Sequence, residues 1–413
     1  MSGRKLYLIF LFASIPVIFF FLFSKHMLLW DVLNIPWDYP HFLDASIFGI
    51  ASESHALGFD PLYVNPQHPL GQRLNYPRIW HLLFALNIDR SHTYIIGSIF
   101  VILFYIGLII FVHRTKFNYP TAIVLTIVTF SPVVMLGIER GNNDLVVFFL
   151  VALAVSLSYF SRFAGLFLLM FASVLNLFPI FGLFYLLKEK KRKFWSLFFS
   201  GLGLFIIYGL YSFNDFKQVY ITTAHSAKVH YGINVYWMAL NHHRIFNLHL
   251  QDDVIMAARI LTYMTIAVIL IVTLLLGIKK SASAKSENMQ HLDFFRVGAI
   301  IYVGTFMLGT NVDYRLMFLI FTIPQLVSWI YIKENKNKSL VPLITLSAIV
   351  FSCWNYVIKK YLLGMKIGFV LEETANCIIL SGLLYLFLTS VPDWFGDFLR
   401  KPFSKIKFLG IMD

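Results

Sequence analysis

The feature that most constrains this chain is a series of long apolar segments that contain almost no charge. Most of them approach 20 residues, the length that an α-helix needs to cross the hydrocarbon core of a bilayer. Charged residues make up 13% of the 413 residues, against about 25% in soluble globular proteins. The chain is therefore predicted to be an all-α polytopic membrane protein. A soluble enzyme, a coiled coil, a disordered chain and an outer-membrane β-barrel are excluded.

We expect about ten full transmembrane helices and one pair of half-helices in a single integral membrane domain, residues 1–413. The half-helices are predicted at 164–175 and 179–187, because Asn176 and Pro179 interrupt that apolar stretch and proline breaks a helix. The first apolar run has no small-residue cleavage site, so we expect an uncleaved span. The full spans are predicted at 6–23, 93–113, 119–137, 145–160, 194–213, 254–278, 294–308, 316–332, 339–357 and 369–390.

Basic residues divide unevenly between the two sides that these spans define. The segments between spans on one side of the membrane contain 20 Lys and Arg in 63 residues, and the segments on the other side contain 12 in 134 residues. Because basic residues accumulate in cytoplasmic loops, the first side is predicted to be cytoplasmic and to contain both termini. The net charge of +13 arises on that side, so we expect no nucleic-acid partner. The exceptions are Lys359, Lys360 and Lys366, which this topology leaves outside. We expect the inner (plasma) membrane of a bacterium.

Polar residues gather in the predicted outer loops, of which residues 24–92 and 214–253 are the largest. An interfacial helix is predicted within 41–57, with Asp44 off its apolar side. The apolar side of that helix is predicted to consist of Leu43, Ile47, Ile50 and Leu57.

Two short outer loops concentrate charged and amide side chains at the edge of apolar spans. Arg140, Asn142 and Asn143 lie in the loop 138–144, and Arg315 lies in the loop 309–315. Charges so close to a bilayer are costly and frequently functional. The alternative is that Arg140 only closes its loop through an ion pair with a neighbouring carboxylate.

Several short motifs follow one another along the first half of the chain. Asp44 precedes the turn GFDPLY at 58–63, and YPRIW at 76–80, RGNNDL at 140–145 and the apolar stretch interrupted at Asn176 come next. Their order and spacing resemble glycosyltransferase family 87 and related polyprenol-phosphate-dependent transferases of the GT-C class. The resemblance is strongest over residues 6–193. In place of Asn176 these proteins usually have a lysine positioned to meet a lipid phosphate.

This resemblance implies a GT-C-like bundle that moves a hexose, such as mannose, from a polyprenyl-phosphate donor to an extracytoplasmic glycan or glycolipid, with inversion. It implies that Asp44 is the catalytic base, which takes the proton of the acceptor hydroxyl. Guanidinium groups would stabilise the leaving phosphate. The residues expected to bind the substrates are Arg78, Arg140, Arg315, Asn142, Asn143, Asp60, Tyr63 and Asn176.

The donor is expected to be lipid-linked, because the chain has neither a soluble nucleotide-binding domain nor a Gly-rich phosphate loop. The outer-loop histidines show no His-x-x-x-His pattern, so we expect no metal and no cofactor. Two other classes stay open. Broken helices are also typical of transporters or flippases of lipid-linked glycans, and a non-enzymatic membrane scaffold would carry similar loops.

Overall fold

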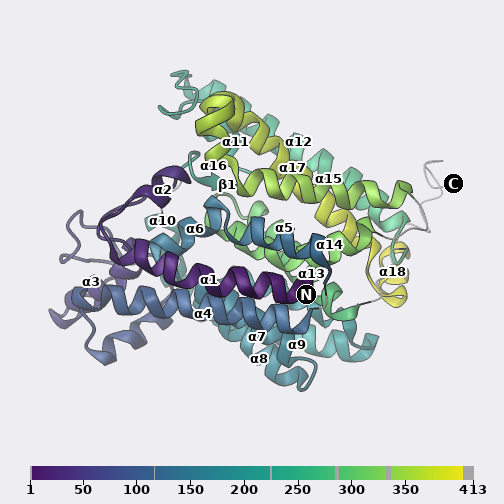
Figure 1. Ribbon diagram of the computed structural model, residues 1–413, viewed down its shortest axis with the longest axis horizontal. Coiled ribbons are helices and arrows are strands. Elements are labelled where there is room, and N and C mark those ends of the chain that lie inside the picture. The colour runs from purple at the N-terminus through teal and green to yellow at the C-terminus, as the bar shows by residue number, and fades with distance from the viewer. Residues whose placement is uncertain (1, 116, 224–225, 284–287, 332–335, 403–413) are drawn as a thin grey trace.

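The computed structural model shows a bundle of helices with a single two-stranded ladder in the part of the chain that it describes (Figure 1). That part comprises residues 2–115, 117–223, 226–283, 288–331 and 336–402. Within it, five helical segments are long and apolar enough to cross a membrane, or six if one bent pair counts as a single span. The prediction of an all-α polytopic membrane protein is thereby confirmed. The five segments are α1 (Gly3–Phe23), Arg90–Arg114 with α4 (Thr93–Arg114), α9 (Lys191–Tyr211), α12 (Asp252–Lys279) and Asn355–Thr389 with α17 (Gly364–Thr389).

Four of the predicted full spans correspond to helices that are too short or not apolar enough to count as candidate membrane spans. The helix α7 (Asp144–Leu157) has only 14 residues, and α13 (Met289–Met307) carries Asp293 and Arg296 near its start. The total of ten spans therefore stays a prediction. The other two spans correspond to η4 (Asp313–Thr322) with α14 (Ile323–Ile330) and to α15 (Lys336–Cys353).

The predicted span 119–137 is bent in the structure. It consists of α5 (Tyr119–Thr129) and α6 (Pro132–Arg140), whose axes differ by 49°. Pro132 has no backbone N–H, so it cannot continue the hydrogen bonds of α5 and instead begins a new helix. The bend sets the direction of α6, which ends at Arg140.

The predicted pair of half-helices is present as α8 (Arg162–Leu175) and η3 (Phe178–Lys188), separated at Asn176. The two arms fold back on each other, since the side chain of Leu169 lies against Gly182. An ion pair of 3.6 Å between Arg162 and Glu189 joins the open end of this hairpin. Its closed end lies beside the first residue of α7, because Asn176 hydrogen-bonds to Asp144.

The loops predicted to share a membrane side meet at the same end of the bundle. Contacts within the predicted cytoplasmic group join Arg4 to the Thr115 carbonyl, Lys188 to Asp293, and Arg400 to Ser281. Parts of five predicted cytoplasmic segments lie outside the described residues: 1–5, 114–118, 279–293, 333–338 and 391–413. The strand β1 (His230–Tyr231) pairs antiparallel with β2 (Asn311–Val312) and so connects the second large outer loop to the loop 309–315.

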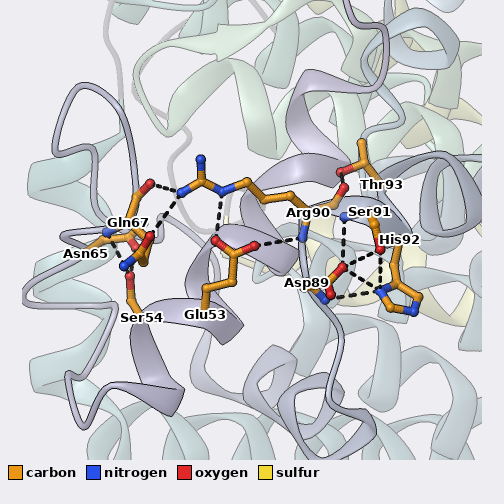
Figure 2. A network of polar contacts seen from close by, with 9 residues as sticks. All are labelled: Glu53, Ser54, Asn65, Gln67, Asp89, Arg90, Ser91, His92 and Thr93. Carbon is orange, nitrogen blue, oxygen red and sulfur yellow. Dashed lines mark hydrogen bonds and ion pairs between the residues drawn. The ribbon is translucent and has the colours of Figure 1, made fainter.

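The first large loop, residues 24–92, is held on the helix α3 (Leu43–Ala56) by a polar network (Figure 2). Arg90 donates to Glu53 from its side chain at 2.8 Å and from its backbone at 3.0 Å, and it also reaches the Gln67 carbonyl. Ser54 donates to Asn65 at 2.6 Å. The network ties α3 to the start of α4 and fixes the helix on which Asp44 stands.

The apolar side of α3 differs from its prediction. Ile47 and Ile50 are buried as expected, but Leu43 and Leu57 are exposed. Phe48 is fully buried instead, because its ring packs 4.8 Å from Trp80. The loop therefore covers a second side of the helix, which the spacing of leucines and isoleucines did not reveal. The remaining short elements are α2 (Leu28–Val32), η1 (Arg78–Leu86), η2 (Arg90–His92), α10 (Phe213–Thr222), α11 (Val235–Met238), α16 (Asn355–Ile358), η5 (Lys359–Leu363) and α18 (Asp393–Arg400).

Candidate active site

The start of α3 is docked against the end of α6. Phe42, which precedes the helix, has a positive φ of 68°, and its backbone N–H donates to the Glu139 carbonyl at 2.8 Å. The Phe42 ring lies against Gly141, which itself has a φ of +57°. A side chain on Gly141 would meet this ring at 2.7 Å. Glycine is therefore required twice over, for its backbone conformation and for the space it leaves.

This docking brings Asp44 to Asn142. The Asn142 amide donates to Asp44 Oδ2 at 2.6 Å, and its own Oδ1 accepts the backbone N–H of Asp144 at 2.8 Å. Within the described residues this is the only hydrogen bond to the Asp44 carboxylate, so Oδ1 has no partner there. Burial raises the pKa of Asp44, while the charge of Arg140 and the bond from Asn142 oppose that rise. The arrangement suits a base that must be ionised but not strongly stabilised as an anion.

Arg140 lies between Asp44 and the segment before α3. Its Nη2 donates to the Pro36 carbonyl at 2.8 Å and pairs with Asp38 at 3.0 Å. Its Nε is 3.4 Å from Glu139, a fully buried carboxylate. The ion pair with Glu139 is one that the loop-closing alternative expected, but the pair with Asp38 joins a different loop, and a contact with substrate stays a prediction.

A second pair of predicted residues converges on Asp144. Arg315 donates from Nε to Asp144 Oδ2 at 3.0 Å, and Asn176 donates to Oδ1 at 2.6 Å. The guanidinium of Arg315 also lies 4.8 Å from the ring centre of Phe178. Both oxygens of this buried carboxylate are therefore occupied, in contrast to those of Asp44. Asp144 thus links the tip of the hairpin, the start of α7 and the loop 309–315.

The remaining predicted residues lie apart from this cluster or take no visible part in it. Arg78 pairs with Asp215 at 2.7 Å and with Asp60 at 2.9 Å, which attaches α10 to the first outer loop. Tyr63 is exposed in the turn that follows Asp60. Asn143 is buried, and its side-chain nitrogen has no hydrogen-bond partner within the described residues.

Two tyrosines also belong to the cluster, although no sequence pattern had pointed to them. The Tyr76 hydroxyl accepts from Asn142 at 3.4 Å, and Tyr314 is close enough to Asp44 for the two groups to interact electrostatically. Each stands in a motif already noted, YPRIW and the loop 309–315, but tyrosines are frequent in this chain. The chain has 21 of them, so frequency alone gave no reason to single out these two.

The cluster unites the loop after the first span, the loop 138–144 and the loop 309–315 around two carboxylates. A family model for glycosyltransferase family 87 matches residues 78–306, more than half of the chain. The chain belongs to glycosyltransferase family 87. It is thus an integral membrane glycosyltransferase, an enzyme with a sugar donor and an acceptor as substrates. No curated protein and no solved structure matches the chain.

The family match differs in extent from the predicted resemblance over 6–193, because it continues well into the second half of the chain. It includes the whole hairpin and the loop 138–144, and it ends before Arg315. Asp44 lies before its first residue, so the role of Asp44 rests on geometry and on the spacing of the first loop. Within the described residues, no group of three or more His, Cys, Asp or Glu side chains is arranged to hold a metal ion.

Proposed function

We propose that this family 87 enzyme transfers a hexose, such as mannose, from a polyprenyl-phosphate donor to an extracytoplasmic glycan or glycolipid, with inversion. The site would face the outside of a bacterial inner membrane, and both termini would be cytoplasmic. The observation that carries the proposal is the partly buried Asp44 carboxylate, which Asn142 holds on one oxygen and to whose other oxygen no described residue donates a hydrogen bond.

In the proposed reaction, Asp44 accepts the proton of an acceptor hydroxyl. The hydroxyl oxygen forms a bond to the anomeric carbon while the bond from that carbon to the phosphate oxygen breaks. The electron pair of that bond leaves with polyprenyl phosphate, and a single displacement inverts the anomeric configuration. Asp44 suits the role better than Asp144, because both Asp144 oxygens already accept hydrogen bonds.

Arg140 and Arg315 are proposed to contact the donor phosphate. The described contacts of Arg140 use Nε and Nη2, and those of Arg315 use Nε and Nη1. Each guanidinium thus keeps one terminal nitrogen for a phosphate oxygen, since it has five N–H donors in all. Asn176 stands where the family usually has a lysine, and its uncharged amide donates a hydrogen bond to Asp144. The positive charge at that carboxylate therefore comes from Arg315.

The test is a transfer assay with purified full-length enzyme in lipid vesicles. The donor is polyprenyl-phosphate mannose labelled in the sugar, and the acceptor is a mannose-bearing glycolipid. The expected result is labelled glycolipid with inverted anomeric configuration and one polyprenyl phosphate released per transfer. Retained configuration, or transfer from a nucleotide sugar only, would contradict the proposal. Movement of the intact donor across the membrane without cleavage would instead support the flippase alternative.

A further inference from the structure

Exposed basic side chains gather beside α18, at the end of the bundle opposite α3 (Figure 1). We call five of them the basic patch: Lys190, Lys191, Arg192 and Lys193 at the start of α9, and Lys280 directly after α12. Within the part of the chain that the structure describes, none of their side chains makes a hydrogen bond or an ion pair. The patch therefore presents positive charge that is available to a ligand.

The helix α18 brings the two parts of the patch together. The ring of Phe395 packs 5.7 Å from that of Phe194, in the first turn of α9. The next residue of α18, Gly396, lies against Ser281, which follows Lys280 in the chain. Arg400, at the other end of α18, donates to the Ser281 hydroxyl at 2.7 Å. The start of α9 and the end of α12 thus contact the same short helix, and their cations share one surface.

The carboxylates of these elements do not balance the patch. Glu189, directly before it in the chain, is paired with Arg162 at 3.6 Å. Asp397 of α18 is paired with Arg400 at 2.8 Å. Among the described residues of α18 and of the two helix ends, Asp393 is the one carboxylate left to oppose five cations. A group of cations without matching anions favours an anionic ligand.

The packing of α9 does not explain why four cations stand at its start. Basic side chains stabilise a helix near its C-terminus, where the helix dipole is negative, and not near its N-terminus. Basic residues also keep a loop on the cytoplasmic side of a membrane. That role requires no ligand, and it does not account for the exposed aromatic rings that stand beside the patch.

These rings indicate that the ligand is a lipid. Phe398 of α18 and Phe199 of α9 are 48% and 59% exposed. Their rings lie 5.2 and 5.3 Å from that of Trp195, two residues beyond the patch. Of the five candidate spans, α9 and α12 have the smallest buried share, 17% each, so most of their surface faces lipid. The patch thus lies where two lipid-facing helices reach the membrane surface.

We propose that the basic patch and α18 bind anionic phospholipids of the leaflet at this end of the bundle. The phosphate groups would accept hydrogen bonds from the lysines and from Arg192, and the acyl chains would cover Phe199 and Phe398. Clusters of about four to eight Lys and Arg beside a membrane helix are typical of such recognition. The site is separate from the Asp44 cluster and does not depend on the proposed transfer reaction.

The test uses the purified full-length enzyme in detergent micelles that contain equal amounts of phosphatidylglycerol and phosphatidylcholine. Native mass spectrometry counts the lipids that stay bound. The wild type should retain phosphatidylglycerol in preference to phosphatidylcholine. The triple variant Lys191→Gln, Arg192→Gln, Lys193→Gln should bind phosphatidylglycerol about 100-fold more weakly, because each basic residue near an anionic surface contributes roughly fivefold. Replacing Lys191 and Lys193 by Arg keeps the charge and should keep the affinity.

The matched control removes the same charge from exposed lysines elsewhere, with the substitutions Lys25→Gln, Lys217→Gln and Lys366→Gln. Its affinity for phosphatidylglycerol should equal that of the wild type. An equal loss in this control would show that net charge alone decides, and would overturn the proposal. Wild-type affinity in the triple variant of the patch would overturn it as well.

Competition identifies the class of ligand. Glycerol 1-phosphate carries the phosphate without acyl chains, and a short RNA oligonucleotide is a soluble polyanion. Neither should displace phosphatidylglycerol from the wild type at equal concentration. Displacement by glycerol 1-phosphate would show a site for soluble anions, and displacement by the oligonucleotide would show a nucleic-acid site. Either result would overturn the proposal.

The lipid site and the proposed function fail in different ways. If the wild type transfers sugar but the triple variant retains phosphatidylglycerol normally, the lipid site is wrong and the proposed function stands. If the wild type retains phosphatidylglycerol through the patch but transfers no sugar from polyprenyl phosphate, the lipid site stands and the proposed function is wrong.

Discussion

The hydrogen bond from Asn142 to Asp44 should set the pH range in which the enzyme works. At 2.6 Å, the amide stabilises the ionised form of the carboxylate and so lowers its pKa. A hydrogen bond to a charged group contributes about 1.5–3 kcal/mol, and one pKa unit corresponds to about 1.4 kcal/mol. Removing the amide in Asn142→Ala should therefore raise the pKa of Asp44 by about 1–2 pH units, in the same direction as the effect of burial.

The sign of the effect on activity follows from the role of the base. Asp44 must be ionised to accept a proton, so kcat/KM falls as the pH drops through its pKa. In Asn142→Ala the acidic limb of the pH profile should move about 1–2 pH units higher, with activity largely recovered above the new pKa. The assay is the transfer of labelled hexose, measured across the pH range at low donor concentration.

A control is needed because Asn142 also accepts the backbone N–H of Asp144 near the start of α7. Losing such a cap costs about 0.5–2 kcal/mol of stability. Asn118→Ala removes a comparable cap at α5, where the Asn118 side chain accepts from Thr121 at 3.1 Å. Both variants should melt at a lower temperature, but only Asn142→Ala should move the acidic limb. An unmoved limb in Asn142→Ala would refute the reasoning.

Two other predictions concern stability and topology. Gly141→Ala should lower the melting temperature, because the new methyl group meets the Phe42 ring and a left-handed conformation costs about 1–2 kcal/mol outside glycine. In Gly203→Ala, the control, the methyl group meets open space within a helix and should stabilise by roughly 0.5–1 kcal/mol; equal losses in both variants would contradict the packing argument. In a background without the two native cysteines, a cysteine at Ser24 should react with an impermeant thiol reagent from outside, and one at Lys190 should be protected. Labelling at 190 from outside would contradict the predicted orientation of the hairpin.

The elements that could be predicted from the sequence were those with a local physical cause. Asn176 and Pro179 interrupt an apolar stretch, and the structure breaks there into two arms that fold back. The charged loops could be grouped by side, and the described contacts join the loops of each group. The 49° bend at Pro132 has an equally local cause, although residues 119–137 were predicted only as one full span.

The contacts that build the site could not be predicted, because they join residues far apart in the chain. Asp44 meets Asn142 only because a glycine allows Phe42 to dock on the end of α6. Lys359 is another example. Charge counting left it as an exception outside the membrane, whereas the structure pairs it with Glu372, a carboxylate of the following apolar helix. The spacing of a single segment carries no information on such a pair.

The central claim is that Asp44 is the catalytic base, and Asp44→Asn tests this directly. The substitution keeps the size of the side chain and its ability to hydrogen-bond but removes its basicity. Transfer from polyprenyl-phosphate mannose should fall about 10²- to 10⁴-fold, while donor binding and melting temperature stay unchanged. Asp252→Asn, at the exposed first residue of α12, should transfer sugar at the wild-type rate. Transfer by Asp44→Asn within a few-fold of the wild type would contradict the account.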